Sequence, residues 1–129
     1  MPSRPLKLFF DGGCRPNPGM IETAVVAGGV THHRPDRGYG TNNDAEWLAL
    51  LDAAELAIGL GAAEIILVGD SALVLNQANE VWPCRSDALR VHLEAFRALA
   101  PSFASVRFRQ VGRSQNLAGI ALERVHGRL

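Results

Sequence analysis

Residues 6–19 read LKLFFDGGCRPNPG, and this stretch decides how the chain begins to fold. Leu6 to Phe10 is an apolar run with two aromatic residues, which is typical of a β-strand. Asp11-Gly12-Gly13, followed by prolines at 16 and 18, predicts that the strand stops there, because glycine and proline favour turns. We therefore expect a first strand that ends on an aspartate.

The rest of the chain alternates between strand-like and helix-like segments, which indicates an α/β domain. The Gly28-Gly29 pair predicts a hairpin between two early antiparallel strands, because glycine accepts positive φ at little steric cost. In chain order we expect strands at 21–27 and 30–33, a helix capped by Asn42, Asn43 or Asp44, a strand at 64–68, a short helix capped by Asp70 or Ser71, a helix at 86–99, a strand at 106–111 and a helix at 115–125.

Length and composition suit one ordinary domain. With 129 residues and 47% apolar content the chain can bury one hydrophobic core, so we expect a single domain over residues 1–129. There is no run of about 18 apolar residues, and the N-terminal apolar run is too short for a signal peptide. We therefore expect a cytoplasmic protein. Cys14 and Cys84 match no paired metal or disulfide motif, so both are expected to be thiols.

The zero net charge conceals a segregation of charge along the chain. Residues 42–81 carry seven acidic side chains and no Lys or Arg, whereas residues 83–129 carry eight Arg against three acids. An Arg-rich part suits a nucleic-acid partner, since contacts from Arg to phosphates supply much of the non-specific affinity. A solvated Arg-rich helix surface explains the same pattern, and charge alone does not separate the two.

Three acidic residues stand where a site is expected. Asp11 and Asp70 each follow a predicted strand, and open α/β sheets bind ligands at the carboxyl ends of their strands. Glu46 lies in the first turn of the helix after the hairpin, from which it can reach the same edge. Clustered carboxylates need a counter-charge, and oxygen ligands favour Mg²⁺ or Mn²⁺ over Zn²⁺. Each residue alone also suits a turn, a helix cap or a helix dipole, so only their joint arrangement predicts a metal site.

Three motifs, in this order and at this spacing, resemble type 1 ribonuclease H. They are residues 11–19 (DGGCRPNPG), 41–46 (TNNDAE) and 69–71 (GDS), and residues 108–122 resemble the end of the family's short, reverse-transcriptase-like branch. The resemblance implies a ribonuclease H-like fold with a mixed five-stranded sheet, its first three strands antiparallel, and helices on both faces. It also implies hydrolysis of the RNA strand of an RNA–DNA hybrid by two metal ions about 3.5–4 Å apart.

The same resemblance implies roles for individual residues. Asp11 would bridge both ions, and Glu46 and Asp70 would each complete one side. The 2′-hydroxyl distinguishes RNA from DNA, and short polar side chains with free backbone N–H groups suit its recognition. The substrate-binding positions that the resemblance implies are Gly13, Cys14, Arg15, Asn17, Asn42, Arg113 and Asn116.

The chain departs from the family at the fourth carboxylate. The family has an Asp four residues after the Asn of the last helix, and Ile120 stands at that place here. Glu123 lies one turn further along the helix, about 4.5 Å from Ile120 at 1.5 Å rise per residue. It could replace the missing ligand only if the helix slid along its axis, so we expect it to be a solvated surface residue. The loop before this helix has Arg113 and no His, and the basic helical handle of some relatives is missing.

The leading hypothesis is a Mg²⁺-dependent endonuclease, with Mn²⁺ as the alternative ion, that acts on an RNA–DNA hybrid or other nucleic acid. No membrane contact or obligate protein partner is expected. The first alternative is a lapsed enzyme that binds the hybrid but has lost turnover with the fourth carboxylate. The second is a small-molecule domain that holds a phosphate-bound Mg²⁺. The absence of a phosphate-binding loop from the sequence argues against it.

Overall fold

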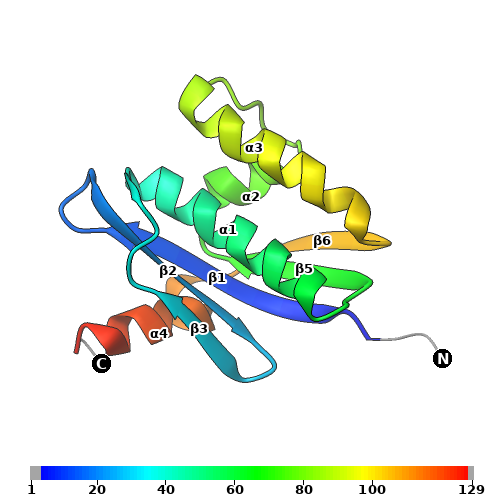
Figure 1. Cartoon of the computed structure of the whole chain (residues 1–129), viewed down its shortest axis with the longest axis horizontal. Helices are drawn as coiled ribbons and strands as arrows, with labels where there is room; N and C mark the ends of the chain where they lie inside the picture. The colour runs from blue at the N-terminus through cyan, green and yellow to red at the C-terminus, as the bar shows by residue number, and fades with distance from the viewer. Residues whose placement is uncertain (1–3, 128–129) are drawn as a thin grey trace.

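The computed structural model describes residues 4–127, which form a sheet flanked by helices (Figure 1). The strands are β1 (Leu6–Cys14), β2 (Gly19–Ala27), β3 (Val30–Arg34), β4 (Tyr39–Gly40), β5 (Glu64–Gly69) and β6 (Ser105–Gln110). The helices are α1 (Asn42–Gly59), α2 (Ala72–Ala78), α3 (Asp87–Leu99) and α4 (Leu117–Val125), with 3₁₀ turns at Ala100–Ser102 and Arg113–Gln115. Within residues 4–127, none of the helices has both the length and the apolar character needed to cross a membrane.

The main path of the sheet runs β3-β2-β1-β5-β6. β2 is antiparallel to both β1 and β3, whereas β5 is parallel to both β1 and β6. The expected mixed α/β sheet with three antiparallel early strands is therefore confirmed. The sheet has six strands instead of five, because the two-residue β4 pairs with β2 beside the main path. A strand of two residues is too short to leave a periodic pattern in the sequence.

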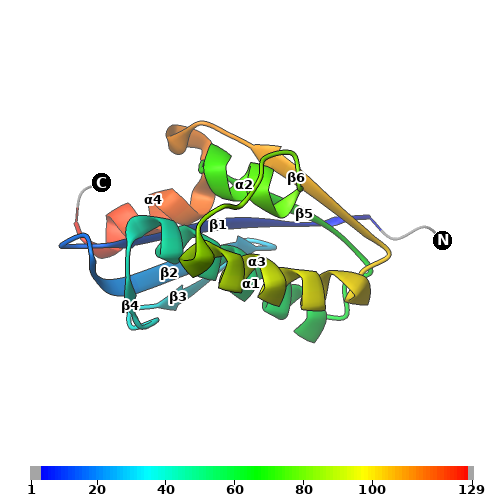
Figure 2. The same cartoon turned by 90° about the horizontal axis from the view of Figure 1, so that it is seen from above.

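Helices cover both faces of the sheet, as expected. α1 packs on one face with α2 and α3 next to it, and α4 packs on the opposite face against β1 and β2 (Figure 1, Figure 2). Because α1 lies between the sheet and α3, it is buried around most of its circumference. Its Trp47 is fully buried and donates from Nε1 to Oε1 of Gln77 on α2 at 3.1 Å. The smaller core under α4 consists of Ala24, Val26, Ala118 and Leu122.

The starts of α1 and α4 differ by a residue or two from the expected ones, whereas the cap of α2 agrees. Thr41 caps α1, and Asp44 completes a capping box with it, so none of the three expected residues is the cap itself. Ser71 caps α2, which is one of the two expected residues. Asn116 caps α4, which begins at Leu117 and not at 115, because residues 113–115 form a 3₁₀ turn.

β1 continues past the aspartate at which we expected it to end. It pairs with β2 as far as Cys14, opposite Ile21, so Asp11 lies three residues before the end of the strand. The Gly28-Gly29 hairpin is confirmed, and both glycines have positive φ, at +57° and +77°. Gly12 has another function: a Cβ there would lie 2.1 Å from the carbonyl oxygen of Ala45, so its missing side chain lets α1 approach β1.

The contact at Gly12 yields a prediction about stability. Gly12→Ala should lower the free energy of unfolding by about 1–3 kcal/mol, because backbone and not a flexible side chain must move to make room. Gly13→Ala is the matched control, since a Cβ at that position would meet only Oδ1 of Asn42 at 3.9 Å. Urea unfolding of both variants measures the difference, and equal stability of the two would contradict this account of the contact.

Candidate functional site

The pairing of β1 with β5 brings two aspartates together. The two strands are parallel with a constant offset of 59 residues, as in Leu6↔Ile65 and Phe9↔Val68. Two residues further along, the same offset sets Asp11 opposite Asp70, the residue that follows β5. The two carboxylates therefore meet because of strand register, at the carboxyl end of β5.

Glu46 reaches the same place from α1. It is the fifth residue of the helix, so it begins the second turn and does not lie in the first turn as expected. Its Oε1 accepts a hydrogen bond from the backbone N–H of Gly12 at 2.7 Å, across the close contact between α1 and β1. One carboxylate oxygen from each of Asp11, Glu46 and Asp70 lies within 4.8 Å of the others. The convergence predicted from the sequence is present in the structure.

The cluster is short of positive charge and of hydrogen-bond donors. Burial raises the pKa of Glu46 well above its ordinary value, and the negative charge of Asp11 raises it further. Burial also raises the pKa of Asp11, with Asp70 adding to the effect and Arg113 opposing it. Oε2 of Glu46 is buried without a hydrogen-bond partner among residues 4–127. Such an atom normally costs free energy, and its presence indicates a missing partner.

A divalent cation fits this set of ligands. All three side chains offer oxygen, which Mg²⁺ and Mn²⁺ prefer, and a cation would supply the charge and the partner that Oε2 of Glu46 lacks. Neither His nor Cys belongs to the cluster among the described residues. The donors therefore match a hard ion and give no indication of zinc.

Asn116 orients one of these ligands. It has no exposed surface, and its amide nitrogen donates to Oδ2 of Asp70 and to the carbonyl oxygen of Phe10, at 3.0 Å each. Its Oδ1 accepts from the N–H of Ala118 and so caps α4. The resemblance implied that Asn116 binds substrate, but a fully buried side chain is placed to fix Asp70 and α4 instead.

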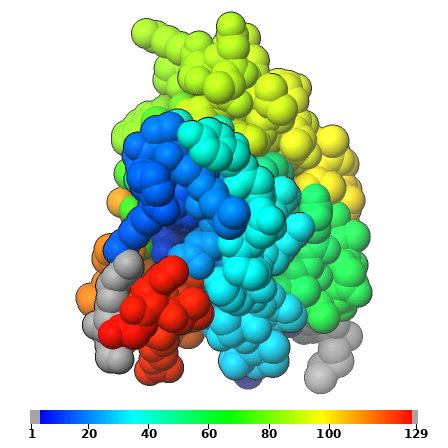
Figure 3. Space-filling view, turned by 60° about the vertical axis from the view of Figure 1, so that its left-hand side comes forward, coloured from blue at the N-terminus to red at the C-terminus, as the bar shows by residue number. Residues whose placement is uncertain are grey.

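A cleft of about 570 Å³ opens over the carboxylates. Figure 3 shows it as a hollow between the connection from β1 to β2 (blue) and α4 (red). Of the residues predicted from the sequence, those that line it are Asp11, Gly13, Cys14, Arg15, Asn17, Asn42, Glu46, Asp70 and Arg113. The lining residues that were not predicted are Gly12, Pro16, Glu22, Ser71, Leu122, Glu123 and His126. Helical spacing alone could have suggested Leu122, Glu123 and His126, since they lie one or two turns after Asn116 or Gly119, in α4 or directly after it.

The loop after β1 is joined to the start of α1. Asn42 accepts the backbone N–H of Cys14 on its Oδ1 at 3.1 Å, and the backbone N–H of Asn42 donates to Oδ1 of Asn17, also at 3.1 Å. The Cys14 thiol lies 3.4 Å from the same Oδ1 of Asn42, and both cysteines of the chain are free, as expected. Because the side-chain oxygen of Asn42 accepts from Cys14, the amide NH₂ group of Asn42 points away from Cys14.

The surroundings of Glu123 differ from the expectation. We expected a solvated surface residue, but its side chain is only 25% exposed, lines the cleft and lies 3.3 Å from Nη2 of Arg113. Ile120 is half-buried and does not line the cleft. The position on α4 that faces Asp11 is Gly119, where a Cβ would lie 3.5 Å from Oδ2 of Asp11.

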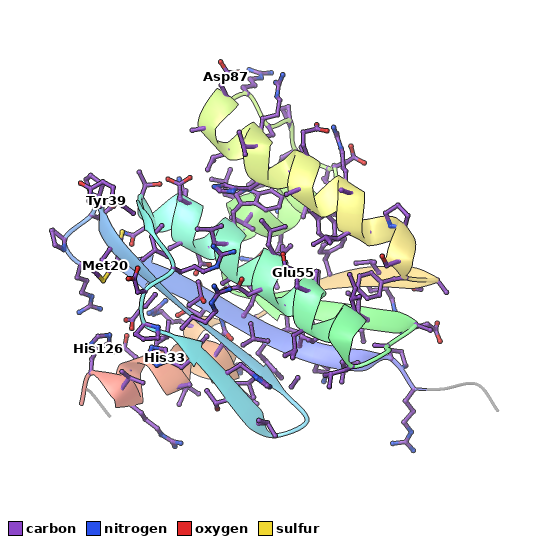
Figure 4. The ribbon with its side chains drawn as sticks, in the orientation of Figure 1. Met20, His33, Tyr39, Glu55, Asp87 and His126 are labelled. Atoms are coloured by element: carbon purple, nitrogen blue, oxygen red, sulfur yellow. The ribbon has the colours of Figure 1, made fainter. Side chains whose placement is uncertain are left out.

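Another carboxylate of the cleft, that of Glu22, is hydrogen-bonded to two histidines. Glu22 on β2 is hydrogen-bonded to Nε2 of His33 at 3.1 Å and to Nε2 of His126. Figure 4 shows these two histidines beside one another, His33 on β3 and His126 directly after α4. Glu22 therefore ties the end of α4 to the sheet.

Comparison with known proteins gives one consistent family. The family model described as "Reverse transcriptase-like" matches residues 28–123. A ribonuclease HI of Halobacterium salinarum is 35% identical over 119 residues, which cover 88% of this chain and 60% of the relative. A bifunctional protein of Mycobacterium tuberculosis is 33% identical over 113 residues, which cover 82% of this chain and 31% of the relative. The chain thus spans between 31% and 60% of the length of these curated relatives.

Solved structures agree with the sequence relatives. The crystal structure of ribonuclease H1 from Halobacterium salinarum matches with a TM-score of 0.83 at 31% identity, covering 95% of this chain and 98% of that chain. The N-terminal ribonuclease H domain of the Mycobacterium tuberculosis protein matches with a TM-score of 0.80 at 28% identity, covering 92% and 95%. A ribonuclease H1 isolated from compost, in complex with an RNA/DNA hybrid, matches with a TM-score of 0.77 at 26% identity, covering 86% and 88%.

The raised pKa of Glu46 predicts a dependence of stability on pH. In metal-free protein, a carboxyl whose pKa is raised by folding destabilises the folded state increasingly as pH rises above its unfolded-state pKa, and fully once pH exceeds the raised folded-state pKa. Glu46→Gln has no charge to bury and keeps an oxygen for the N–H of Gly12, so it should be more stable than wild type at neutral pH by about 1 kcal/mol. The difference should shrink as pH falls and Glu46 takes up its proton.

Urea unfolding in a chelator between about pH 5 and about pH 8 measures this difference. Glu55→Gln, an exposed change on the same helix, is the matched control and should show no such trend. Added Mg²⁺ should reverse the order, because it stabilises only a folded state that binds it. A stability difference between wild type and Glu46→Gln that stays constant across the pH range would contradict a raised pKa of Glu46.

Proposed function

Because the chain belongs to the reverse transcriptase-like, ribonuclease H family, we propose that it is a metal-dependent endonuclease that cuts the RNA strand of an RNA–DNA hybrid. The observation that carries the proposal is the cluster of Asp11, Glu46 and Asp70 at the floor of the cleft. The hybrid as substrate is supported by a structural relative that was solved with RNA/DNA hybrid bound.

The three carboxylates would hold Mg²⁺, with Mn²⁺ as the alternative ion. Divalent ions held there would supply Lewis acidity, which lowers the pKa of an attacking water and stabilises a leaving oxygen. In the two-metal arrangement that the family implies, Asp11 would serve both ions and Glu46 and Asp70 one ion each. Asn116 fixes the direction of Asp70, and the N–H of Gly12 fixes that of Glu46, so two of the ligands are held before an ion arrives.

The rest of the cleft suits a polyanion. Arg15 and Arg113 extend into it with side chains 65% and 61% exposed, and guanidinium groups bind phosphate through paired N–H donors. The uncharged residues of the loop from Gly13 to Asn17 and the amide of Asn42 line the neighbouring wall. We propose that the arginines contact phosphates and that the loop and Asn42 contact the sugar edge of the RNA strand.

One observation favours a second candidate, a domain that binds the hybrid without cutting it. The resemblance places Ile120 where the family has its fourth carboxylate, and Ile120 does not line the cleft. Gly119, which faces Asp11, has no side chain to offer a ligand. Membership of this family gives no support to the alternative of a small-molecule domain that holds a phosphate-bound Mg²⁺. A cytoplasmic location stays a prediction.

A cleavage assay separates the two candidates. The wild type, incubated with labelled RNA–DNA hybrid and Mg²⁺ or Mn²⁺, should cut the RNA strand, and Asp70→Asn should reduce the rate at least about 100-fold, because it removes a ligand and leaves the shape of the side chain. Asp87→Asn is the control, since Asp87 is an exposed residue at the start of α3, far from α4 (Figure 4).

The other outcomes are equally distinct. Binding of the hybrid without cleavage, with activity appearing only in Ile120→Asp or Gly119→Asp, identifies the lapsed enzyme. Absence of hybrid binding with either ion contradicts both candidates. Gel-shift binding and thermal melting of each variant show that a lost activity is not a lost fold.

A further inference from the structure

Arg113 stands between the carboxylate cluster and Glu123. Its Nη1 lies 3.9 Å from Oδ1 of Asp11 and 3.8 Å from Oδ2 of Asp70, while its Nη2 lies 3.3 Å from Oε1 of Glu123. The two longer distances exceed a hydrogen bond, whereas the third is within hydrogen-bond range. The guanidinium is thus attracted to the aspartates by charge but hydrogen-bonded to Glu123.

Arg113 would compete with a metal ion for Asp11 and Asp70. A metal bound by Asp11 and Asp70 would lie close to the guanidinium, which is within 3.9 Å of one oxygen of each aspartate, and two cations at the same carboxylates repel each other. Arg113 cannot leave by losing its proton, because the charges of Asp11, Asp70 and Glu123 outweigh its partial burial and raise its pKa. The position of the guanidinium, and not its protonation, must therefore change when an ion binds.

Glu123 pairs with Nη2 of Arg113, whereas the two aspartates lie nearest to Nη1. Its side chain also lies 3.9 Å from Nη2 of Arg15, so it stands between two arginines of the cleft. The neighbouring carboxylate, Glu22, is engaged by His33 and His126 and forms no ion pair with Arg113 among the described residues. Glu123 is therefore the side chain whose attraction balances that of the metal-site aspartates on Arg113.

Building on the proposed metal site, we propose that Glu123 is a positioning residue that holds the Arg113 guanidinium back from Asp11 and Asp70. By doing so it sets how tightly the three carboxylates bind a divalent ion. It also keeps the guanidinium in the cleft after the ion has bound, where a phosphate of the substrate would lie.

The proposal makes opposite predictions for the two partners. Without the charge of Glu123, the guanidinium should close on the aspartates and weaken metal binding, whereas loss of Arg113 should strengthen it. For a charge about 4 Å from the ligands, screened at the edge of an open cleft, we expect about a tenfold change for Arg113→Gln and about threefold to tenfold for Glu123→Gln. Because Glu123 acts through Arg113, the double variant should bind metal as Arg113→Gln does, within about twofold.

Isothermal titration of Mg²⁺ and Mn²⁺ into wild type, both single variants and the double variant measures this cycle. Repeating it in about 0.5 M salt weakens the direct attraction of Glu123 for the ion through solvent. Glu94→Gln is the matched control, since it breaks an exposed ion pair with Arg97 on α3 and does not line the cleft. Glu123→Asp, one methylene shorter, should restore part of the affinity, and excess metal should restore the cleavage rate of Glu123→Gln.

Each result decides the matter. If Glu123→Gln weakens metal binding equally with and without Arg113, Glu123 acts on the ion directly and the positioning role is overturned. No change in metal affinity in Glu123→Gln would overturn it as well. If wild type cuts the hybrid and binds metal but the cycle shows no coupling, this inference fails alone. If wild type neither binds metal nor cuts, the proposed function fails with it.

Discussion

The close contact of α1 with β1 at Gly12 is the constraint on which the site depends. A helix can approach a strand this closely only where the strand has no side chain, and here the gap is filled by the backbone of Ala45. One residue further along α1, Glu46 accepts the N–H of Gly12 and is fixed next to Asp11. The same contact buries Glu46 and Asp11, which raises the pKa of both carboxyl groups. The contact at Gly12 therefore accounts both for the packing of α1 on β1 and for the raised pKa values of Asp11 and Glu46.

Much of the fold could be predicted because its signals are local. The apolar runs of β1 and β5, the Gly28-Gly29 hairpin and the motifs around Asp11, Glu46 and Asp70 each lie within a few consecutive residues. What was missed is set by pairing between distant segments. β1 extends beyond Asp11 because β2 pairs with it, and β4 exists because Tyr39 and Gly40 meet residues 19–20. The organisation as a single domain over residues 1–129 stays a prediction.

The candidate site likewise has a part that the sequence predicts and a part that it does not. The carboxylates could be predicted, because strand register and a helix start place them where sequence motifs suggest. The surroundings of Glu123 could not, because they depend on the direction of an arginine side chain that belongs to a 3₁₀ turn before α4. Asn116 is a related case: its motif indicates the site correctly, but only the structure shows that it is buried and supports Asp70 from behind.

The proposed nucleic-acid substrate and the carboxylates on the floor of the cleft both carry negative charge, so they would repel each other. Metal ions held by the carboxylates would reduce the repulsion on the floor but would not reach the walls. Arg15 and Arg113 supply positive charge there, and Glu123 between them lowers their mutual repulsion. An arginine that is paired with a carboxylate on α4 stays near the floor without being bound to it, since its distances to Asp11 and Asp70 remain beyond hydrogen-bond length. The chain thus combines two carboxylates held in place, Glu46 by the N–H of Gly12 and Asp70 by Asn116, with an exposed arginine that, in our proposal, shifts when an ion and the substrate enter.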